Sequence, residues 1–79
     1  MKKFDIIKDK WIKKINSNSN EVELIRLKSI SKISYKQDIV SSILLYGDGV
    51  GMSFHYVQNE LEQFKGDINF FENILFNLE

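Results

Sequence analysis

The stretch VQNELEQFKGDINFFENILFNL, residues 57–78, decides the fold of this chain. Apolar residues recur along it at intervals that alternate between four and three. They are Val57, Leu61, Phe64, Ile68, Phe71, Leu75 and Leu78. This spacing places them on one side of an α-helix. The sequence therefore predicts a long C-terminal helix with a single continuous apolar face.

The start and the middle of this helix carry further signals. Asn59 is a plausible N-cap, with Glu62 three residues later as in a capping box. Gly66 lies in the interior, where glycine costs about 1 kcal/mol relative to alanine. The apolar spacing keeps its phase across Gly66, which favours one continuous helix. Two helical pieces hinged at Gly66 and Asp67 are the alternative.

Residues 2–15 are predicted to form an N-terminal helix. Phe4, Ile7, Trp11 and Ile15 lie within a narrow arc of a helical wheel, so one face of this helix would be apolar. In that arrangement Trp11 is expected to anchor the core. A strand through residues 9–15 is the competing interpretation of the same segment.

The middle of the chain has the pattern of strands. Residues 16–20, with only Asn and Ser, form a loop by composition. From Ile25 to Lys36, apolar residues at odd positions alternate with basic residues at even positions, which predicts strands with a cationic outer face. Residues 29–31 interrupt the alternation, so a bulge or bend is expected there.

Residues 39–56 predict a hairpin. The run from Ile39 to Tyr46 is apolar in both alternating sets, which is typical of a central strand covered on both faces. Asp48 and Gly49 follow, and this dipeptide favours the type I′ turn of a tight hairpin. The predicted fold class is α+β: a small antiparallel meander of three to four strands with an N-terminal and a long C-terminal helix packed on it, in one domain spanning residues 1–79.

Composition narrows the class of protein. The 79 residues contain no cysteine, so disulfides and thiolate chemistry are excluded. No apolar run approaches about 18 residues, and no signal peptide is evident, so a cytoplasmic location without membrane contact is expected. Abundant Ile, Lys, Asn and Phe, with no Ala or Pro, indicate AT-rich coding, as in a low-GC bacterium, its phage or a mobile element.

The net charge is zero, but the charges are segregated. Residues 1–36 hold ten basic and four acidic residues, 10 − 4 = +6, whereas residues 37–79 hold one and seven, 1 − 7 = −6. Such asymmetry indicates a charged partner. The alternative is that the two halves neutralise each other within the fold.

The search for reactive chemistry gives no candidate catalytic residue. His55 is the only histidine and is expected to point outward from a strand. The glycines of residues 47–51 lack the GK[ST] ending of a phosphate-binding loop and fit a tight turn instead. We therefore predict a non-enzyme that needs no metal and no cofactor.

Two surfaces are candidates for binding. Phe70 and Ile74 lie outside the main apolar stripe of the C-terminal helix and could form an exposed partner-binding patch, with Glu60, Glu62 and Asp67 as acidic contacts. The alternative is that Phe70 and Ile74 pack against the N-terminal helix. If they are exposed, a homodimer through this helix is the simplest outcome.

The second surface is basic and would bind nucleic acid through phosphates. Its residues are Arg26, Lys28, Lys32, Lys36, Lys10 and Lys14. The absence of an aromatic residue on the same strand face weighs against this interpretation.

The leading hypothesis is therefore a non-catalytic, protein-binding module. A phage or mobile-element inhibitor of a host defence system, of the anti-CRISPR kind, is a plausible setting, with a host defence or nucleic-acid-handling protein as its partner. The rival hypothesis is a small nucleic-acid-binding regulator that uses the basic face.

Overall fold

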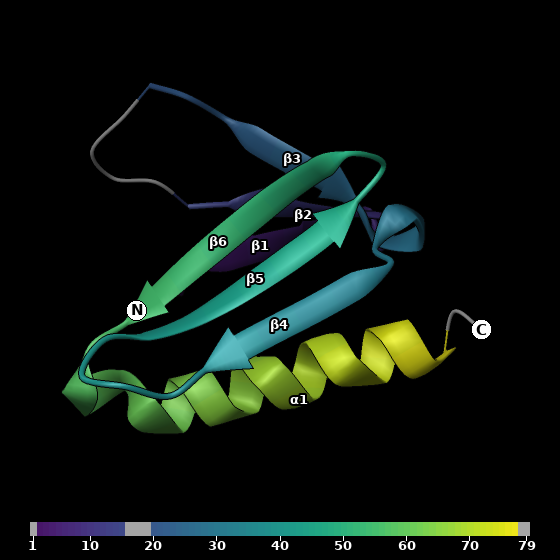
Figure 1. The fold of residues 1–79 in the computed structure, drawn as a ribbon. Coiled ribbons are helices and arrows are strands. Elements are labelled where there is room, and N and C mark those ends of the chain that lie inside the picture. Colours follow the sequence, from purple (N-terminus) through teal and green to yellow (C-terminus); the bar gives the residue numbers. More distant parts are fainter. Residues whose placement is uncertain (1, 16–19, 78–79) are drawn as a thin grey trace.

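The computed structural model describes residues 2–15 and 20–77, which form two three-stranded antiparallel sheets followed by one long helix (Figure 1). The N-terminal sheet consists of β1 (Phe4–Ile7), β2 (Trp11–Lys14) and β3 (Glu23–Arg26). The C-terminal sheet consists of β4 (Lys32–Lys36), β5 (Ser41–Gly47) and β6 (Val50–Tyr56). Two 3₁₀ turns, η1 (Leu27–Ser29) and η2 (Gln58–Glu60), precede β4 and the helix α1 (Leu61–Asn77) respectively.

The predicted N-terminal helix is wrong, because residues 4–14 form the β1–β2 hairpin. Ile6 pairs with Ile12 in register, and both side chains face the interior, as does Ile25 of β3. The helical wheel omitted Ile6 and Ile12, whereas a strand buries them by simple alternation. Isoleucine and tryptophan also favour strands. The alternative strand, predicted over residues 9–15, is observed as β2.

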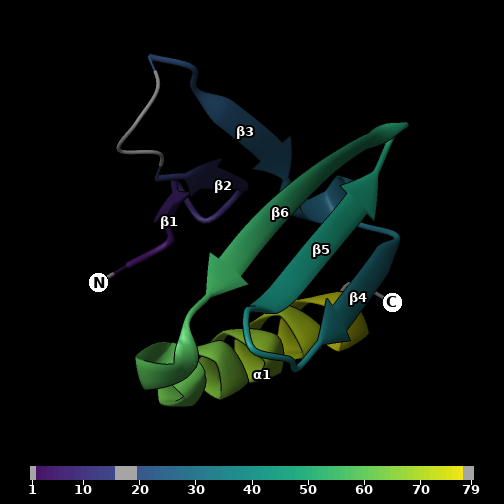
Figure 2. The same ribbon diagram turned by 60° about the vertical axis from the view of Figure 1, so that its left-hand side comes forward.

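The alternating pattern between residues 25 and 36 is confirmed in outline. Ile25 is buried, and the basic residues at even positions are exposed. The break expected at residues 29–31 begins earlier, with the turn η1, and β4 after it belongs to the C-terminal sheet. The predicted single meander is therefore two sheets. Figure 2 shows them side by side above α1.

The predicted hairpin of β5 and β6 is confirmed, but only one face of β5 is covered. Gly47 pairs with Val50, and Asp48 and Gly49 both have positive φ, at 52° and 76°, as a type I′ turn requires. Ile43 and Leu45 are fully buried, whereas Tyr46 is exposed. The expectation of burial on both faces is thus wrong, because on the second face Tyr46 is exposed and Ser42 and Leu44 are only half-buried.

The C-terminal helix is confirmed as one continuous element through Gly66. It begins at Leu61, two residues after the predicted cap, because Glu60 instead accepts a hydrogen bond from the Val57 amide at 3.0 Å. Val57 is exposed, and Leu78 lies outside the described residues. In the described ranges, no helix has both the length and the apolarity needed to cross a membrane.

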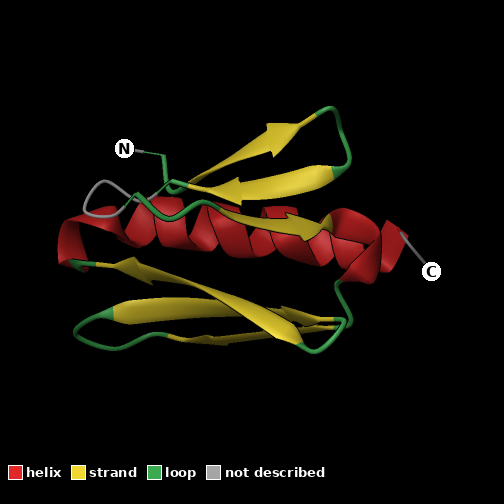
Figure 3. Ribbon diagram, turned by 90° about the horizontal axis from the view of Figure 1, so that it is seen from above, coloured by secondary structure: helices red, strands yellow, loops and turns green. Residues whose placement is uncertain are grey.

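One aromatic cluster joins both sheets to the helix. The ring of Phe71 lies 4.8 Å from that of Phe4 in β1 and 5.8 Å from that of Phe54 in β6, centroid to centroid. Phe4 and Phe54 are themselves 5.6 Å apart. Seen from above, the sheets lie on either side of α1 (Figure 3). The two sheets and α1 therefore share a single core, with Phe71 at its centre.

Gly47 lies at a close approach between β5 and η1. A Cβ atom built on Gly47 would lie 2.0 Å from the carbonyl oxygen of Ser29, which belongs to the backbone and has little room to move. The neighbouring Ser31 amide donates to the Tyr46 carbonyl at 2.8 Å and fixes the same contact. The sheets are joined here without space for a side chain.

We expect Gly47→Ala to lower the free energy of unfolding by at least about 2 kcal/mol, because the backbone must separate to admit the methyl group. Urea denaturation followed by circular dichroism measures the loss. Gly51→Ala is the matched control, since its Cβ would meet neighbours at the ordinary distance of 3.5 Å. Equal stabilities for the two variants would contradict the close approach.

We expect Gly66→Ala to raise the free energy of unfolding by about 0.5–1 kcal/mol. Gly66 is inside α1, and a Cβ there meets nothing within 4 Å. Alanine therefore gains helix propensity without a clash. The same urea titration measures the gain, and a destabilised Gly66→Ala variant would show that the helix is bent at this position.

Candidate functional site

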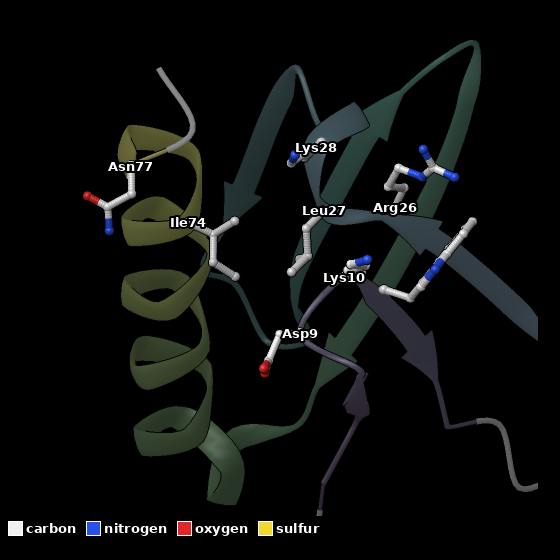
Figure 4. Close-up of a pocket in the computed structure, with 8 residues that line it drawn as sticks. Asp9, Lys10, Arg26, Leu27, Lys28, Ile74 and Asn77 are labelled. Carbon is white, nitrogen blue, oxygen red and sulfur yellow. The ribbon is translucent and has the colours of Figure 1, made fainter.

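A cleft of about 450 Å³ lies between the N-terminal sheet and the last turns of α1 (Figure 4). It is bordered by the β1–β2 turn, by the junction of β3 and η1, and by the end of the helix. Its lining residues are Asp9, Lys10, Trp11, Arg26, Leu27, Lys28, Ile74 and Asn77. Its volume falls in the range of ligand-binding clefts in proteins.

The register of the N-terminal sheet places Trp11 beside Arg26. The two residues are paired across β2 and β3, and their side chains share the outer face of the sheet. The guanidinium carbon of Arg26 lies 5.0 Å from the centre of the Trp11 ring, which is a cation–π contact. The prediction that Trp11 anchors the core is therefore wrong, because Ile12 occupies the inward position of β2.

The β1–β2 turn brings Asp9 and Lys10 to the cleft. Lys8 and Asp9 have positive φ, at 54° and 57°, and the Lys10 amide donates to the Ile7 carbonyl at 3.0 Å. Glycine or asparagine usually occupies positions with positive φ, and a lysine in this backbone conformation is strained. A second bond, from the Leu27 amide to the Lys10 carbonyl at 2.9 Å, ties the turn to the start of η1.

The lining combines positive charge with an apolar gap. Lys10, Arg26 and Lys28 against Asp9 give 3 − 1 = +2 for the cleft. Among the described residues, 2–15 and 20–77, the cations that form ion pairs are Lys2, Lys3, Lys14 and Lys36, so the cations of the cleft belong to none of these pairs. Figure 4 shows Leu27 and Ile74 pointing toward each other across the gap.

The remaining predicted basic residues lie elsewhere. Lys32 and Lys36 are on the open face of the C-terminal sheet, where the amine of Lys32 lies 5.2 Å from the centre of the Tyr46 ring. Lys36 forms an exposed ion pair with Asp38. Lys14 faces inward and pairs with Glu23 at 3.7 Å. The six basic residues predicted as one surface are thus divided among three places.

The predicted partner-binding residues are also separated. Glu60 forms an ion pair with Lys3 at 2.9 Å, while Glu62 is exposed in the first turn of α1. Phe70 stacks on Phe4 at 5.6 Å and remains 38% exposed, beside a smaller cleft that Asp67 also lines. Phe70 therefore packs against the N-terminal segment, as the alternative expected, although this segment is a strand. Ile74 alone reaches the larger cleft.

The hydroxyl of Tyr56 donates a 2.6 Å hydrogen bond to the carboxylate of Asp67. Tyr56 is fully buried, and its burial, the bond to Asp67 and the nearby carboxylates together hold the pKa of its phenol well above the usual value. Lys3 and the Val57 amide lower the pKa of Glu60. Asp67 and Glu60, both expected to contact a partner, thus already have roles within the fold.

Sequence reasoning missed Asp9, Trp11, Leu27 and Asn77 as lining residues. The signal available was the segment KDK between two isoleucine-rich stretches, which is compatible with a turn once the flanking residues are treated as strands. Comparisons with protein-family models, with curated proteins and with solved structures give no significant match for this chain.

We expect the stability of the protein to fall as the pH rises above about 10, the usual pKa of tyrosine. Tyr56 stays protonated in the folded state while the unfolded chain releases the proton, so unfolding becomes easier by up to about 1.4 kcal/mol per pH unit. Tyr56→Phe should remove this part of the alkaline slope and cost about 1 kcal/mol at pH 7.

Urea titrations at pH 7, 9 and about 11 compare the two proteins. Tyr35→Phe is the control, because it removes a hydroxyl from a half-exposed tyrosine outside the core. An identical alkaline slope in wild type and Tyr56→Phe would contradict the assigned role of the buried hydroxyl.

Proposed function

We propose that this protein is a non-catalytic, protein-binding module whose contact surface is the cleft between the N-terminal sheet and α1. The observation that carries the proposal is the Trp11–Arg26 pair, which lines the cleft and does not belong to the core. Tryptophan and arginine are the residues that contribute most often to the energetic centre of protein interfaces.

The chemistry of the lining agrees with binding better than with catalysis. The described lining residues supply one carboxylate and neither a serine nor a histidine, and covalent catalysis needs a nucleophile next to an activating base. They also supply the apolar pair Leu27 and Ile74 beside charged groups. Interfaces combine these two features as an apolar centre and a polar rim.

The biological setting remains the one that composition suggests. AT-rich coding and small size favour a phage or mobile-element protein that inhibits a host defence system of the anti-CRISPR kind. The partner would then be a host defence or nucleic-acid-handling protein. A homodimer would instead form through the exposed part of Phe70.

One observation favours the second candidate function, a small nucleic-acid-binding regulator. Tyr46 is exposed on the same face as Lys32 and Lys36, in register with Lys32 and Gly51, so an aromatic ring does accompany these cations. Single strands bind to surfaces where aromatic rings stack on bases and basic residues contact phosphates. The site for nucleic acid would then be the open sheet face, not the cleft.

Two double variants, each of which removes two positive charges, distinguish the protein-binding function from the nucleic-acid-binding function. Lys10→Gln/Lys28→Gln neutralises the cleft, and Lys32→Gln/Lys36→Gln neutralises the sheet face. Tagged proteins are used to capture partners from a nuclease-treated extract of a low-GC bacterium. We expect wild type and the sheet-face variant to retain the same protein and the cleft variant to lose most of it.

Filter binding to DNA and RNA at rising salt completes the test. Affinity that falls steeply with salt and is lost in Lys32→Gln/Lys36→Gln would establish the nucleic-acid function instead. Retention of one partner by all three proteins would show that the cleft is not the contact surface.

A further inference from the structure

Resting on the proposed function, we infer that the cleft binds an acidic segment of the partner protein, with an aliphatic side chain seated between Leu27 and Ile74 and carboxylates placed against Lys10, Arg26 and Lys28. The inference identifies the chemistry of the partner, which the fold alone leaves open.

Charge complementarity is the first argument. The cleft has a formal charge of +2, and its three cations have no carboxylate partner in the described part of the chain. The protein as a whole is neutral, so this is a local excess. Carboxylates would supply the missing partners, and charge complementarity across interfaces governs both specificity and the rate of association.

The apolar gap is the second argument, and it favours a peptide over nucleic acid. Leu27 and Ile74 are both half-buried and point toward each other, so an aliphatic side chain between them would bury apolar surface on both. A phosphate backbone has no group that suits this position.

The rim of the cleft is the third argument. Asp9 and the last turn of α1 at Asn77 border the cleft, and the final carbonyl groups of a helix lack intrahelical donors. Peptide amides can donate to a carboxylate and to such carbonyls, whereas phosphodiesters carry no donor. The amide groups of a peptide can therefore use these acceptors, although the carboxylate of Asp9 repels its acidic side chains.

The fluorescence of Trp11 reports binding in the cleft directly, because Trp11 is the only tryptophan of the chain. The probe is the capped pentapeptide Glu-Glu-Leu-Glu-Glu, titrated into the protein at low salt while Trp11 fluorescence and backbone amide chemical shifts are recorded. The comparison peptides are Gln-Gln-Leu-Gln-Gln, which lacks charge, and Glu-Glu-Ala-Glu-Glu, which lacks the aliphatic side chain. An oligothymidylate of the same charge is the fourth probe.

We expect saturable changes at Trp11, Arg26 and Leu27 with the acidic leucine peptide. Affinity should be weaker by about fivefold for the uncharged peptide and about tenfold for the alanine peptide. Lys10→Gln/Lys28→Gln should weaken binding by about fivefold, and Lys32→Gln/Lys36→Gln should leave it unchanged.

Asp9→Asn should strengthen binding by about twofold, because it removes a repulsive charge. Asparagine also tolerates the positive φ at this position, so the variant should fold at least as well as wild type. A gain in affinity cannot arise from damage to the structure, which makes this the most informative variant.

Equal affinities for the charged and uncharged peptides, or no response of Trp11 to either, would overturn the inference. So would a stronger response of Trp11 to the oligothymidylate than to the peptide. If capture of a protein partner nevertheless depends on Lys10 and Lys28, the proposed function stands and only the acidic chemistry is wrong. If capture is also independent of these lysines, both the proposed function and the inferred acidic partner segment are wrong.

Discussion

The contact of the Phe71 ring with Phe4 and Phe54 is the constraint on which the rest of this structure depends. A chain of 79 residues buries only part of the surface it exposes when unfolded, so it cannot supply a separate core for each sheet. The three rings solve this problem by meeting at one point from β1, β6 and α1. Each aromatic pair adds about 0.5–1.5 kcal/mol to the energy of simple burial. The two sheets are therefore held in their relative positions by the helix together with the direct Phe4–Phe54 contact.

The cleft follows from the same arrangement. The last buried aromatic residue of α1 is Phe71, and beyond it the half-buried Ile74 lies opposite Leu27. The outer face of the N-terminal sheet, with Trp11 and Arg26, reaches the edge of this gap through the β3–η1 junction. The candidate site thus lies where the shared core ends, and it combines residues from the turn, the strands and the helix.

The parts of the fold that depend on local signals could be predicted from the sequence. The four-and-three spacing identified α1, and Asp48 with Gly49 identified the β5–β6 hairpin. The β1–β2 hairpin was missed because its turn uses Lys8 and Asp9 at positive φ, where glycine or asparagine is the usual signal. The cations of the cleft were recognised individually, but their grouping was not, since residues 9–11, 26–28 and 74–77 meet only in three dimensions.

The uncovered face of the C-terminal sheet has a consequence for how such a chain can evolve. Ser34, Leu44 and Ser53 form one row across β4, β5 and β6 on this face, and Ser42 with His55 forms part of another. None of these side chains supports the shared core, which lies on the opposite side of the strands. Genetic drift can therefore change this face at less thermodynamic cost than the core, so that descendants of one ancestor acquire different surfaces on an unchanged scaffold.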